Sequence, residues 1–169
     1  MEIGFFGGKF IPFHKGHLHC IEVAAKLCDK VYVILFDSPE QRALEHGTQI
    51  DELLTVSARE KQIKDSIKSY SNVEYKYLNT DTCIDENGKE DWDKETPLVL
   101  KLIGNNFKYV FSSEPSYDAY FKRAYPWAKH IIIDEKRITV PISGTKIRSM
   151  SLEEAQKWIS QNNRSKLKI

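Results

Sequence analysis

The chain has 169 residues, a length typical of a single domain with a substantial apolar core. Apolar residues make up 41% and charged residues 29%, which is the composition of a globular protein. The 25 Lys and Arg side chains nearly balance the 24 Asp and Glu side chains, and this argues against a dedicated nucleic-acid-binding protein. The three cysteines are too few and too scattered for a disulfide framework or a zinc site.

The chain also lacks the usual marks of export and membrane insertion. Its longest purely apolar run, residues 31–36, is far shorter than a membrane span. It starts Met-Glu and enters a strand-like run at once, without the basic start and apolar stretch of a signal peptide. We therefore expect a cytoplasmic protein.

Five short runs rich in apolar residues predict β-strands, at residues 3–6, 31–36, 73–78, 109–112 and 131–134. The second run is apolar throughout, which is typical of a strand buried on both faces of a parallel sheet. Helical patterns follow these runs at residues 17–29, 57–70, 96–103, 115–125 and 151–160. Ser57 with Glu60, and Ser151 with Glu154, have the capping-box spacing, and Pro97 suits the first turn of its helix.

The alternation of strands and helices predicts an α/β fold: a Rossmann-like open parallel five-stranded sheet with helices on both faces. We expect one domain over residues 1–160 and a polar C-terminal tail over residues 161–169. Ligands bind such sheets at the carboxyl ends of the strands, where the strand order reverses. The site is therefore predicted in the loops that follow the strands. Two connections, residues 37–56 and 79–95, are long and polar, as functional loops often are.

The loop after the first predicted strand, residues 7–17, reads G-G-K-F-I-P-F-H-K-G-H. Gly7 and Gly8 allow a tight turn and a close approach of the backbone to a ligand. His14 and His17 lie at a predicted helix N-terminus, which favours phosphate, and their imidazoles can donate hydrogen bonds to phosphate oxygens. A simple turn with a helix cap is the alternative interpretation. A zinc site is disfavoured because no third ligand lies at a suitable spacing.

A second motif, residues 142–148, reads I-S-G-T-K-I-R. Ser143 can cap a short helix, so that backbone N–H groups and the Thr145 hydroxyl face an anion that Arg148 also reaches. Alone, this motif describes an ordinary capped helix, but beside the first motif it indicates a phosphate site. Basic residues gather in the predicted site loops, so we expect a small polyanionic ligand; they are Lys9, Arg42, Lys136, Arg137, Lys146 and Arg148.

The first motif resembles the signature of the HxGH nucleotidyltransferase superfamily, in which the two histidines and the helix N-terminus bind the ATP phosphates. The second resembles the signature of its adenylyltransferase branch. Further stretches resemble the nicotinamide mononucleotide (NMN) adenylyltransferase domain of NadR-type bacterial proteins. They are Phe36-Asp37 followed by Arg42-Ala43-Leu44, Ser113-Glu114, Asp134-x-Lys136-Arg137 and Ile142-Ser143-Gly144. Lys9 stands where related families more often have Thr or Ser.

The resemblance implies a reaction and a set of contacts. The phosphate of NMN would attack the α-phosphate of ATP, giving NAD and pyrophosphate without a covalent intermediate. The implied catalytic residues are His14, His17, Lys9 and Arg148. The implied ATP contacts are Gly7, Gly8, Phe10, His14, His17, Lys136, Arg137, Ile142, Ser143, Thr145 and Arg148. The implied NMN contacts are Lys9, Phe36, Asp37, Trp92, Ser113 and Glu114.

The resemblance also implies the cofactor and the partners. Mg²⁺ is expected on the phosphates, without side-chain ligands. The expected partners are ATP, NMN and NAD, with no nucleic acid and no membrane. Related enzymes often form oligomers, so a homo-oligomer is left open.

Several assignments stay open at this point. Trp92 either stacks on the nicotinamide ring or pins its loop to the surface, and Arg59 is favoured as a residue of a helix face over a phosphate ligand. His19, His46 and His130 are interpreted as structural, and Cys83 has no assigned role. The acceptor could instead be nicotinate mononucleotide, phosphopantetheine or the substrate of a cytidylyl transfer. A non-catalytic nucleotide sensor is a further alternative, and a class I aminoacyl-tRNA synthetase is disfavoured by the short chain.

Overall fold

The computed structural model describes residues 1–42 and 47–159, so the predicted C-terminal tail lies outside the described residues. Five strands form one sheet in the order β3-β2-β1-β4-β5, and every pairing is parallel. Their bounds are β1 Ile3–Gly8, β2 Lys30–Asp37, β3 Val73–Asn79, β4 Tyr109–Ser112 and β5 Lys129–Ile132. The predicted Rossmann-like sheet is confirmed, with the last strand two residues earlier than expected.

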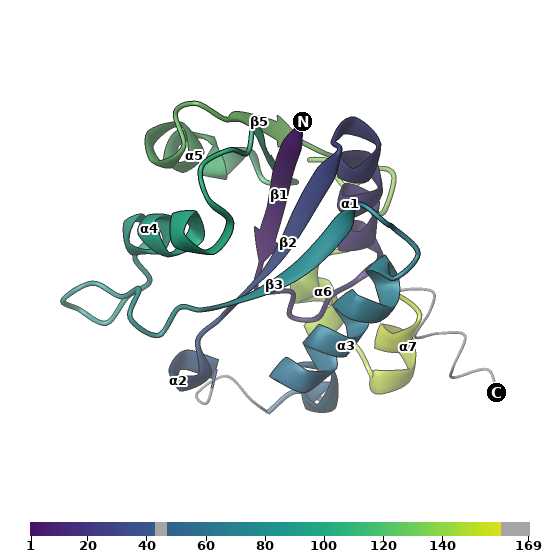
Figure 1. The fold of residues 1–169 in the computed structure, drawn as a ribbon. Helices are drawn as coiled ribbons and strands as arrows, with labels where there is room; N and C mark the ends of the chain where they lie inside the picture. The colour runs from purple at the N-terminus through teal and green to yellow at the C-terminus, as the bar shows by residue number, and fades with distance from the viewer. Residues whose placement is uncertain (43–46, 160–169) are drawn as a thin grey trace.

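Helices cover both faces of this sheet (Figure 1). The seven α-helices of the described residues are α1 Lys15–Leu27, α2 Pro39–Arg42, α3 Val56–Ile67, α4 Trp92–Ile103, α5 Asp118–Ala124, α6 Gly144–Arg148 and α7 Leu152–Gln156. Two short 3₁₀ segments, η1 Asp51–Leu53 and η2 Pro115–Tyr117, precede α3 and α5. Figure 1 shows α1 and α3 on one face of the sheet and α4 and α5 on the other.

The alternation of side chains along the strands divides the apolar core. Phe6 belongs to a cluster that packs against α1 and α3, and the preceding residue, Phe5, belongs to a second cluster on the α4 and α5 face. Both rings are at least 96% buried, since successive strand residues point to opposite faces. A third, smaller cluster joins Ile50, just before η1, to Ile147 of α6 and Ala155 of α7, and includes Ile142 of the second motif. This third cluster positions the second motif of the sequence.

The helix starts follow their capping residues. Ser143 and Ser151 cap α6 and α7 as the sequence predicts, each accepting a hydrogen bond from a backbone N–H three residues later. The expected cap of α3 was wrong: the hydroxyl of Thr55, and not that of Ser57, accepts from the N–H of Ala58 at 3.1 Å. This helix therefore begins one residue earlier than the pattern indicates.

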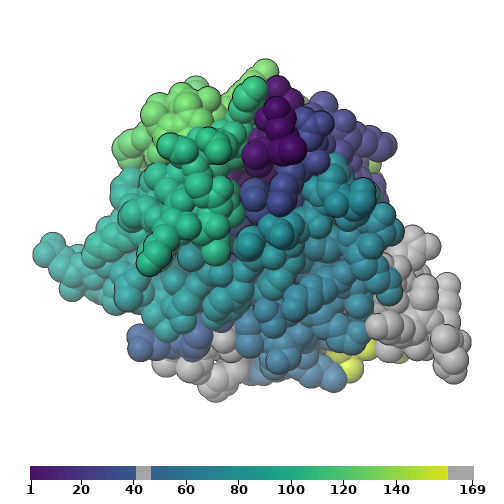
Figure 2. Space-filling model, in the orientation of Figure 1, coloured from purple at the N-terminus to yellow at the C-terminus, as the bar shows by residue number. Residues whose placement is uncertain are grey.

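The start of α4 differs more from the expectation. The carboxylate of Asp91 accepts from the N–H of Asp93 and caps a helix that begins at Trp92, four residues before the predicted start. Pro97 therefore lies inside this helix rather than in its first turn. Figure 2 shows the segment between β3 and α4, in teal, protruding from the side of the molecule. Across the described residues, no helix is long and apolar enough to cross a membrane.

Candidate active site

A cleft of about 400 Å³ opens at the carboxyl ends of β1 and β4. These strands are neighbours in space but not in sequence, so the cleft lies where the strand order reverses. Its walls come from the ends of β1, β2 and β4, the start of α1, the β3–α4 segment, η2 with α5, and the loop after β5. The sequence predicted the ligand site in the loops after the strands, and the cleft occupies this region.

Two glycines let the walls of this cleft approach each other. A Cβ atom at Gly7 would lie 2.2 Å from the Phe36 ring, and one at Gly16 would lie 2.8 Å from the His14 ring. A side chain at either position would displace one of these rings, so glycine keeps the rings in their places. Between them, Phe10 has a φ of 51°, a backbone conformation that non-glycine residues rarely adopt, and its ring contacts the His17 ring at 4.8 Å.

His14 and His17 form a reciprocal cap at the start of α1. The Nδ1 atom of His14 accepts from the N–H of Gly16 at 3.0 Å, and the Nδ1 atom of His17 accepts from the N–H of His14 at 3.1 Å. The rings stack with their centroids 3.7 Å apart. Because each Nδ1 atom is an acceptor, the proton of each neutral ring is on Nε2. Within the described residues neither Nε2–H has a hydrogen-bond acceptor, so both are available to a ligand.

The surroundings keep both imidazoles neutral. Burial, followed by the charge of Arg137, lowers the pKa of His14 from its ordinary 6.5 to about 3. Burial, followed by His14 and Arg137, holds the pKa of His17 well below its ordinary value. The two rings therefore act as uncharged hydrogen-bond donors at neutral pH.

The lowered pKa of His14 predicts a loss of stability in mild acid. The unfolded chain takes up a proton near pH 6.5, whereas folded His14 takes one up only near pH 3, so the free energy of unfolding decreases as the pH falls between these values. We expect the melting temperature to decrease from pH 7 to pH 4.5, and to decrease less in His14→Asn. Asparagine keeps the capping acceptor but does not titrate. Equal pH dependence in both proteins would contradict the assignment.

Two cations, Lys9 and Arg137, line the cleft. Lys9 forms an ion pair with Glu90 at 2.5 Å, which joins the loop after β1 to the β3–α4 segment. Arg137 has a φ of 52° and donates to the carbonyl oxygen of Ile142 at 2.9 Å. The carboxylate of Asp134 accepts three backbone N–H groups of residues 138–140 and thereby fixes the loop that carries Arg137.

The second motif lies directly against the first. Arg148 donates from Nη1 to the carbonyl oxygen of Ile11 at 2.8 Å and from Nη2 to the Thr145 hydroxyl at 3.3 Å. A Cβ atom at Gly144 would lie 3.1 Å from the same Ile11 oxygen, so glycine permits this close approach. The start of α6 therefore packs beside residues 11–16 without lining the cleft itself.

The opposite end of the cleft is aromatic. Trp92, the first residue of α4, contacts the Tyr117 ring edge-to-face at 4.9 Å and the Tyr120 ring at 5.5 Å. The Tyr120 hydroxyl donates to the carbonyl oxygen of Trp92 at 2.8 Å, which fixes the start of α4 against α5. The sequence left open whether Trp92 is a ligand platform or a loop anchor; its position combines a place in the cleft wall with packing contacts.

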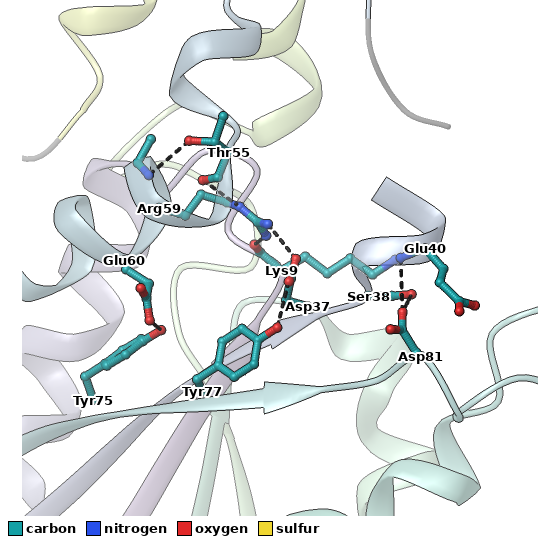
Figure 3. A network of polar contacts seen from close by, with 11 residues as sticks. Lys9, Asp37, Ser38, Glu40, Thr55, Arg59, Glu60, Tyr75, Tyr77 and Asp81 are labelled. Carbon is teal, nitrogen blue, oxygen red and sulfur yellow. Dashed lines mark hydrogen bonds and ion pairs between the residues drawn. The ribbon is translucent and has the colours of Figure 1, made fainter. Parts of the chain in front are cut away.

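A buried polar network supports the loop after β1 (Figure 3). The Nη2 atom of Arg59 forms an ion pair with Asp37 at 2.6 Å, and both side chains are 1% exposed. The Nη1 atom of Arg59 donates to the carbonyl oxygen of Lys9 at 2.8 Å, and the Tyr77 hydroxyl donates to Asp37 at 2.9 Å. Arg59 is therefore neither a surface residue of its helix nor a residue of the cleft wall, and Asp37 does not line the cleft.

A second buried network lies under the other wall. His130 contacts the Ser112 hydroxyl through Nε2 at 2.6 Å and Asp118 through Nδ1 at 3.1 Å. Because a carboxylate only accepts hydrogen bonds, His130 donates from Nδ1 to Asp118, and its Nε2 atom shares a second hydrogen bond with the Ser112 hydroxyl. The Ser112 oxygen in turn accepts from the N–H of Glu114 at 3.2 Å. His130 therefore has a structural role, as the sequence was interpreted: it supports the turn that carries Ser113 and Glu114.

The structure brings most of the sequence-predicted residues to one cleft. Those that line it are Gly7, Gly8, Lys9, Phe10, His14, His17, Phe36, Trp92, Ser113, Glu114 and Arg137. Those outside its lining are Asp37, Lys136, Ile142, Ser143, Thr145 and Arg148. The sequence reasoning missed Glu90, Glu95, Ser112, Tyr117 and Tyr120, which also line the cleft. Only Glu90 and Glu95 carried a usable signal, because they flank Trp92 in the long polar loop.

Comparisons with known proteins agree with this geometry. A parallel Rossmann-like sheet with a loop suited to phosphate at its switch point is typical of a nucleotide-binding domain. The chain belongs to the cytidylyltransferase-like family, whose model matches residues 5–150. The resemblance to HxGH nucleotidyltransferases seen in the sequence is thereby confirmed.

The similar proteins include NAD-related enzymes and one other acceptor class. The chain is 27% identical over 150 residues to the trifunctional NAD biosynthesis/regulator protein NadR of Escherichia coli, covering 86% of this chain and 36% of that protein. It is 39% identical over 74 residues to the phosphopantetheine adenylyltransferase of Mycoplasma capricolum, covering 44% of this chain and 46% of that enzyme. The chain therefore spans about a third of the NadR length.

Solved structures of NadR share the fold. The complex of NadR with NR superposes with a TM-score of 0.69 at 23% identity, covering 96% of this chain and 44% of that chain. The complex of NadR with NAD and AMP-PNP superposes with a TM-score of 0.66 at 24% identity, covering 96% of this chain and 46% of that chain. At this identity the superpositions establish the fold.

Proposed function

We propose that this chain is an adenylyltransferase that joins ATP and NMN to give NAD and pyrophosphate. The observation that carries the proposal is the division of the cleft into two chemically different ends. One end has two neutral imidazole donors and the cation Arg137, and suits phosphates. The other end is built around Trp92, and suits a flat heteroaromatic ring.

In this reaction a phosphate oxygen of NMN attacks the α-phosphorus of ATP, and the bond to the β-phosphate oxygen breaks. Catalysis consists of positioning and charge stabilisation, because the protein forms no covalent bond. The Nε2–H groups of His14 and His17 donate to phosphate oxygens, and Lys9 and Arg137 balance the negative charge. Ser143, Thr145 and Arg148, beside residues 11–16, are the proposed contacts of the departing pyrophosphate.

Mg²⁺ is the cofactor expected for this reaction. Among the described residues, no cluster of three or more His, Cys, Asp or Glu side chains is suited to a metal ion. We propose that Mg²⁺ is bound by phosphate oxygens, where it would neutralise charge on the leaving pyrophosphate. Positioning of the triphosphate by His14 and His17 is then the task of the protein.

A direct test is pyrophosphate release from ATP and Mg²⁺ in the presence of three separate acceptors: NMN, nicotinate mononucleotide and phosphopantetheine. Release with NMN, with NAD formed in equal amount, is the expected result. Release only with phosphopantetheine would favour the second candidate, which the similarity to the Mycoplasma enzyme supports. No release with any acceptor, together with tight NAD binding, would favour a nucleotide sensor.

Trp92 provides a prediction for the acceptor end. Trp92→Ala should raise the KM for the acceptor by about 10–100-fold, because aromatic stacking of a base is worth about 1–3 kcal/mol. Trp92→Phe should retain most of the affinity, and the KM for ATP should change little in either variant. Steady-state kinetics with each substrate varied in turn measures these effects. An equal rise in both KM values would instead point to a general disturbance of the cleft.

A further inference from the structure

Helix α4 presents two residues to the cleft from the same face. Trp92 and Glu95 both line the cavity, and residues three apart on a helix are neighbours on its surface. Glu95 is half-buried, so its carboxylate is partly withdrawn from water. A ring stacked on Trp92 therefore brings its substituents within reach of a side chain that lies about one helical turn further along.

The Glu95 carboxylate is not engaged by the protein. Among the described residues, it has neither a hydrogen-bond donor nor an ion-pair partner, whereas the neighbouring Glu90 is paired with Lys9 at 2.5 Å. Three carboxylates, Glu90, Glu95 and Glu114, line the cleft. The aromatic end therefore holds more carboxylates than cations, since Lys9 pairs with Glu90 there, while Arg137 lies close enough to the two histidines to shift their pKa values and gives their end of the cleft its positive charge.

This distribution of charge in the cleft would distinguish two acceptors that differ in a single group, NMN and nicotinate mononucleotide. The nicotinamide ring of NMN carries a carboxamide, whose N–H₂ group donates hydrogen bonds. Nicotinate mononucleotide carries a carboxylate in that position, which only accepts. An ionised glutamate pairs with the first and repels the second. Sites that hydrogen-bond a particular donor strongly reject analogues that lack it, because the polar group of the protein is left unpaired.

We propose that Glu95 determines the acceptor selectivity of the cleft: its carboxylate accepts a hydrogen bond from the carboxamide N–H₂ of a nicotinamide ring on Trp92 and disfavours the carboxylate of nicotinate. This inference rests on the proposed function, since it assumes an adenylyl acceptor with a pyridine ring. It assigns a specificity-determining role to a residue that the signature motifs do not include.

The ionisation of Glu95 makes this selectivity depend on pH. Burial, followed by the charge of Glu90, raises the pKa of Glu95 to about 7, with Asp91 raising it further and Lys9 lowering it. The other titratable groups that interact with it are Cys83, Tyr117, Tyr120 and Tyr125. Above pH 7 the ionised carboxylate repels nicotinate, and below pH 7 the neutral acid can donate to it. The preference for NMN should therefore increase with pH.

The test compares Glu95→Gln with the wild-type protein. Glutamine has nearly the same shape, and its amide can donate to a carboxylate as well as accept from a carboxamide. The measured quantity is the ratio of kcat/KM for NMN to kcat/KM for nicotinate mononucleotide. We expect this ratio to fall about tenfold or more, the size of one charge-assisted hydrogen bond. The matched control is Glu86→Gln, the same change at an exposed position of the β3–α4 segment.

Each outcome decides a different point. An unchanged ratio in Glu95→Gln, with NMN turned over, would overturn the role of Glu95 and leave the proposed function intact. Wild-type protein without turnover of either pyridine nucleotide would overturn both. A pH series from 6 to 8 on wild-type protein requires no variant: the preference for NMN should rise across this range, and a flat ratio would contradict the role of Glu95.

Discussion

His17→Ala is expected to reduce turnover by about 10²–10³-fold, the usual cost of removing one preorganised donor to developing charge. Its Nδ1 atom is held by the N–H of His14, so the donor Nε2–H has a fixed orientation before any ligand binds. Alanine removes this donor and leaves the neighbouring His14 ring with its own bond to Gly16. The loss should be mainly in kcat, because the interaction strengthens as charge moves to the leaving group.

His19→Ala is the matched control, since it is the same change on the same helix at a residue outside the cleft lining. It should keep turnover within about threefold, far below the effect of losing a preorganised donor. Melting curves of both variants test whether the fold is retained. Turnover of His17→Ala within threefold of the wild-type value would reject the proposed mechanism. A melting temperature that falls only in His17→Ala would mean that its loss of turnover reflects unfolding.

The sheet could be predicted from the sequence because each strand is indicated by a pattern of neighbouring residues. A run such as residues 31–36 is apolar at every position, which is typical of a strand covered on both faces, and the structure pairs it on both sides. Helix ends were less predictable, since several residues compete to cap each one. Asp91, in a polar loop, caps the start of α4, and Thr55 rather than Ser57 caps the start of α3. Both alternatives were present in the sequence, and only tertiary packing selects between them.

In the candidate site, too, contacts between residues close in sequence could be predicted, and contacts between distant residues could not. His14, Gly16 and His17 are close in sequence, so their common position at a helix start followed from their spacing. His130 contacts residues that are distant in sequence, and no periodicity indicates such contacts. The hydrogen bond between Ser112 and His130 joins two adjacent strands. Predicting it would require knowing that β4 and β5 are paired.

Arg59 is the clearest case of a contact that the sequence could not reveal. Helical periodicity placed it on a helix face but could not show what that face meets. In the structure it reaches Asp37, 22 residues earlier, and the carbonyl oxygen of Lys9, 50 residues earlier. The guanidinium thus joins the end of β2 to the loop that follows β1.

Arg59→Met is expected to lower the free energy of unfolding by about 3–5 kcal/mol, because it leaves the Asp37 carboxylate buried without its cation. The Lys9 carbonyl would also lose its donor, so the loop after β1 should loosen and turnover should fall. Denaturant unfolding measures the stability loss. The matched control is Lys61→Met on the same helix, whose surface pair with Asp65 should contribute less than about 1 kcal/mol.

The double variant Arg59→Met with Asp37→Asn separates the ion pair from the packing of the arginine. If the destabilisation comes from an uncompensated charge, neutralising Asp37 should recover part of it, and the double variant should be less destabilised than the sum of the single variants. Additive losses would mean that the two side chains contribute independently. In that case the link between β2 and the phosphate-favouring loop would depend on packing, and Arg59→Lys, which keeps the charge but loses the planar fork, should be as damaging as Arg59→Met.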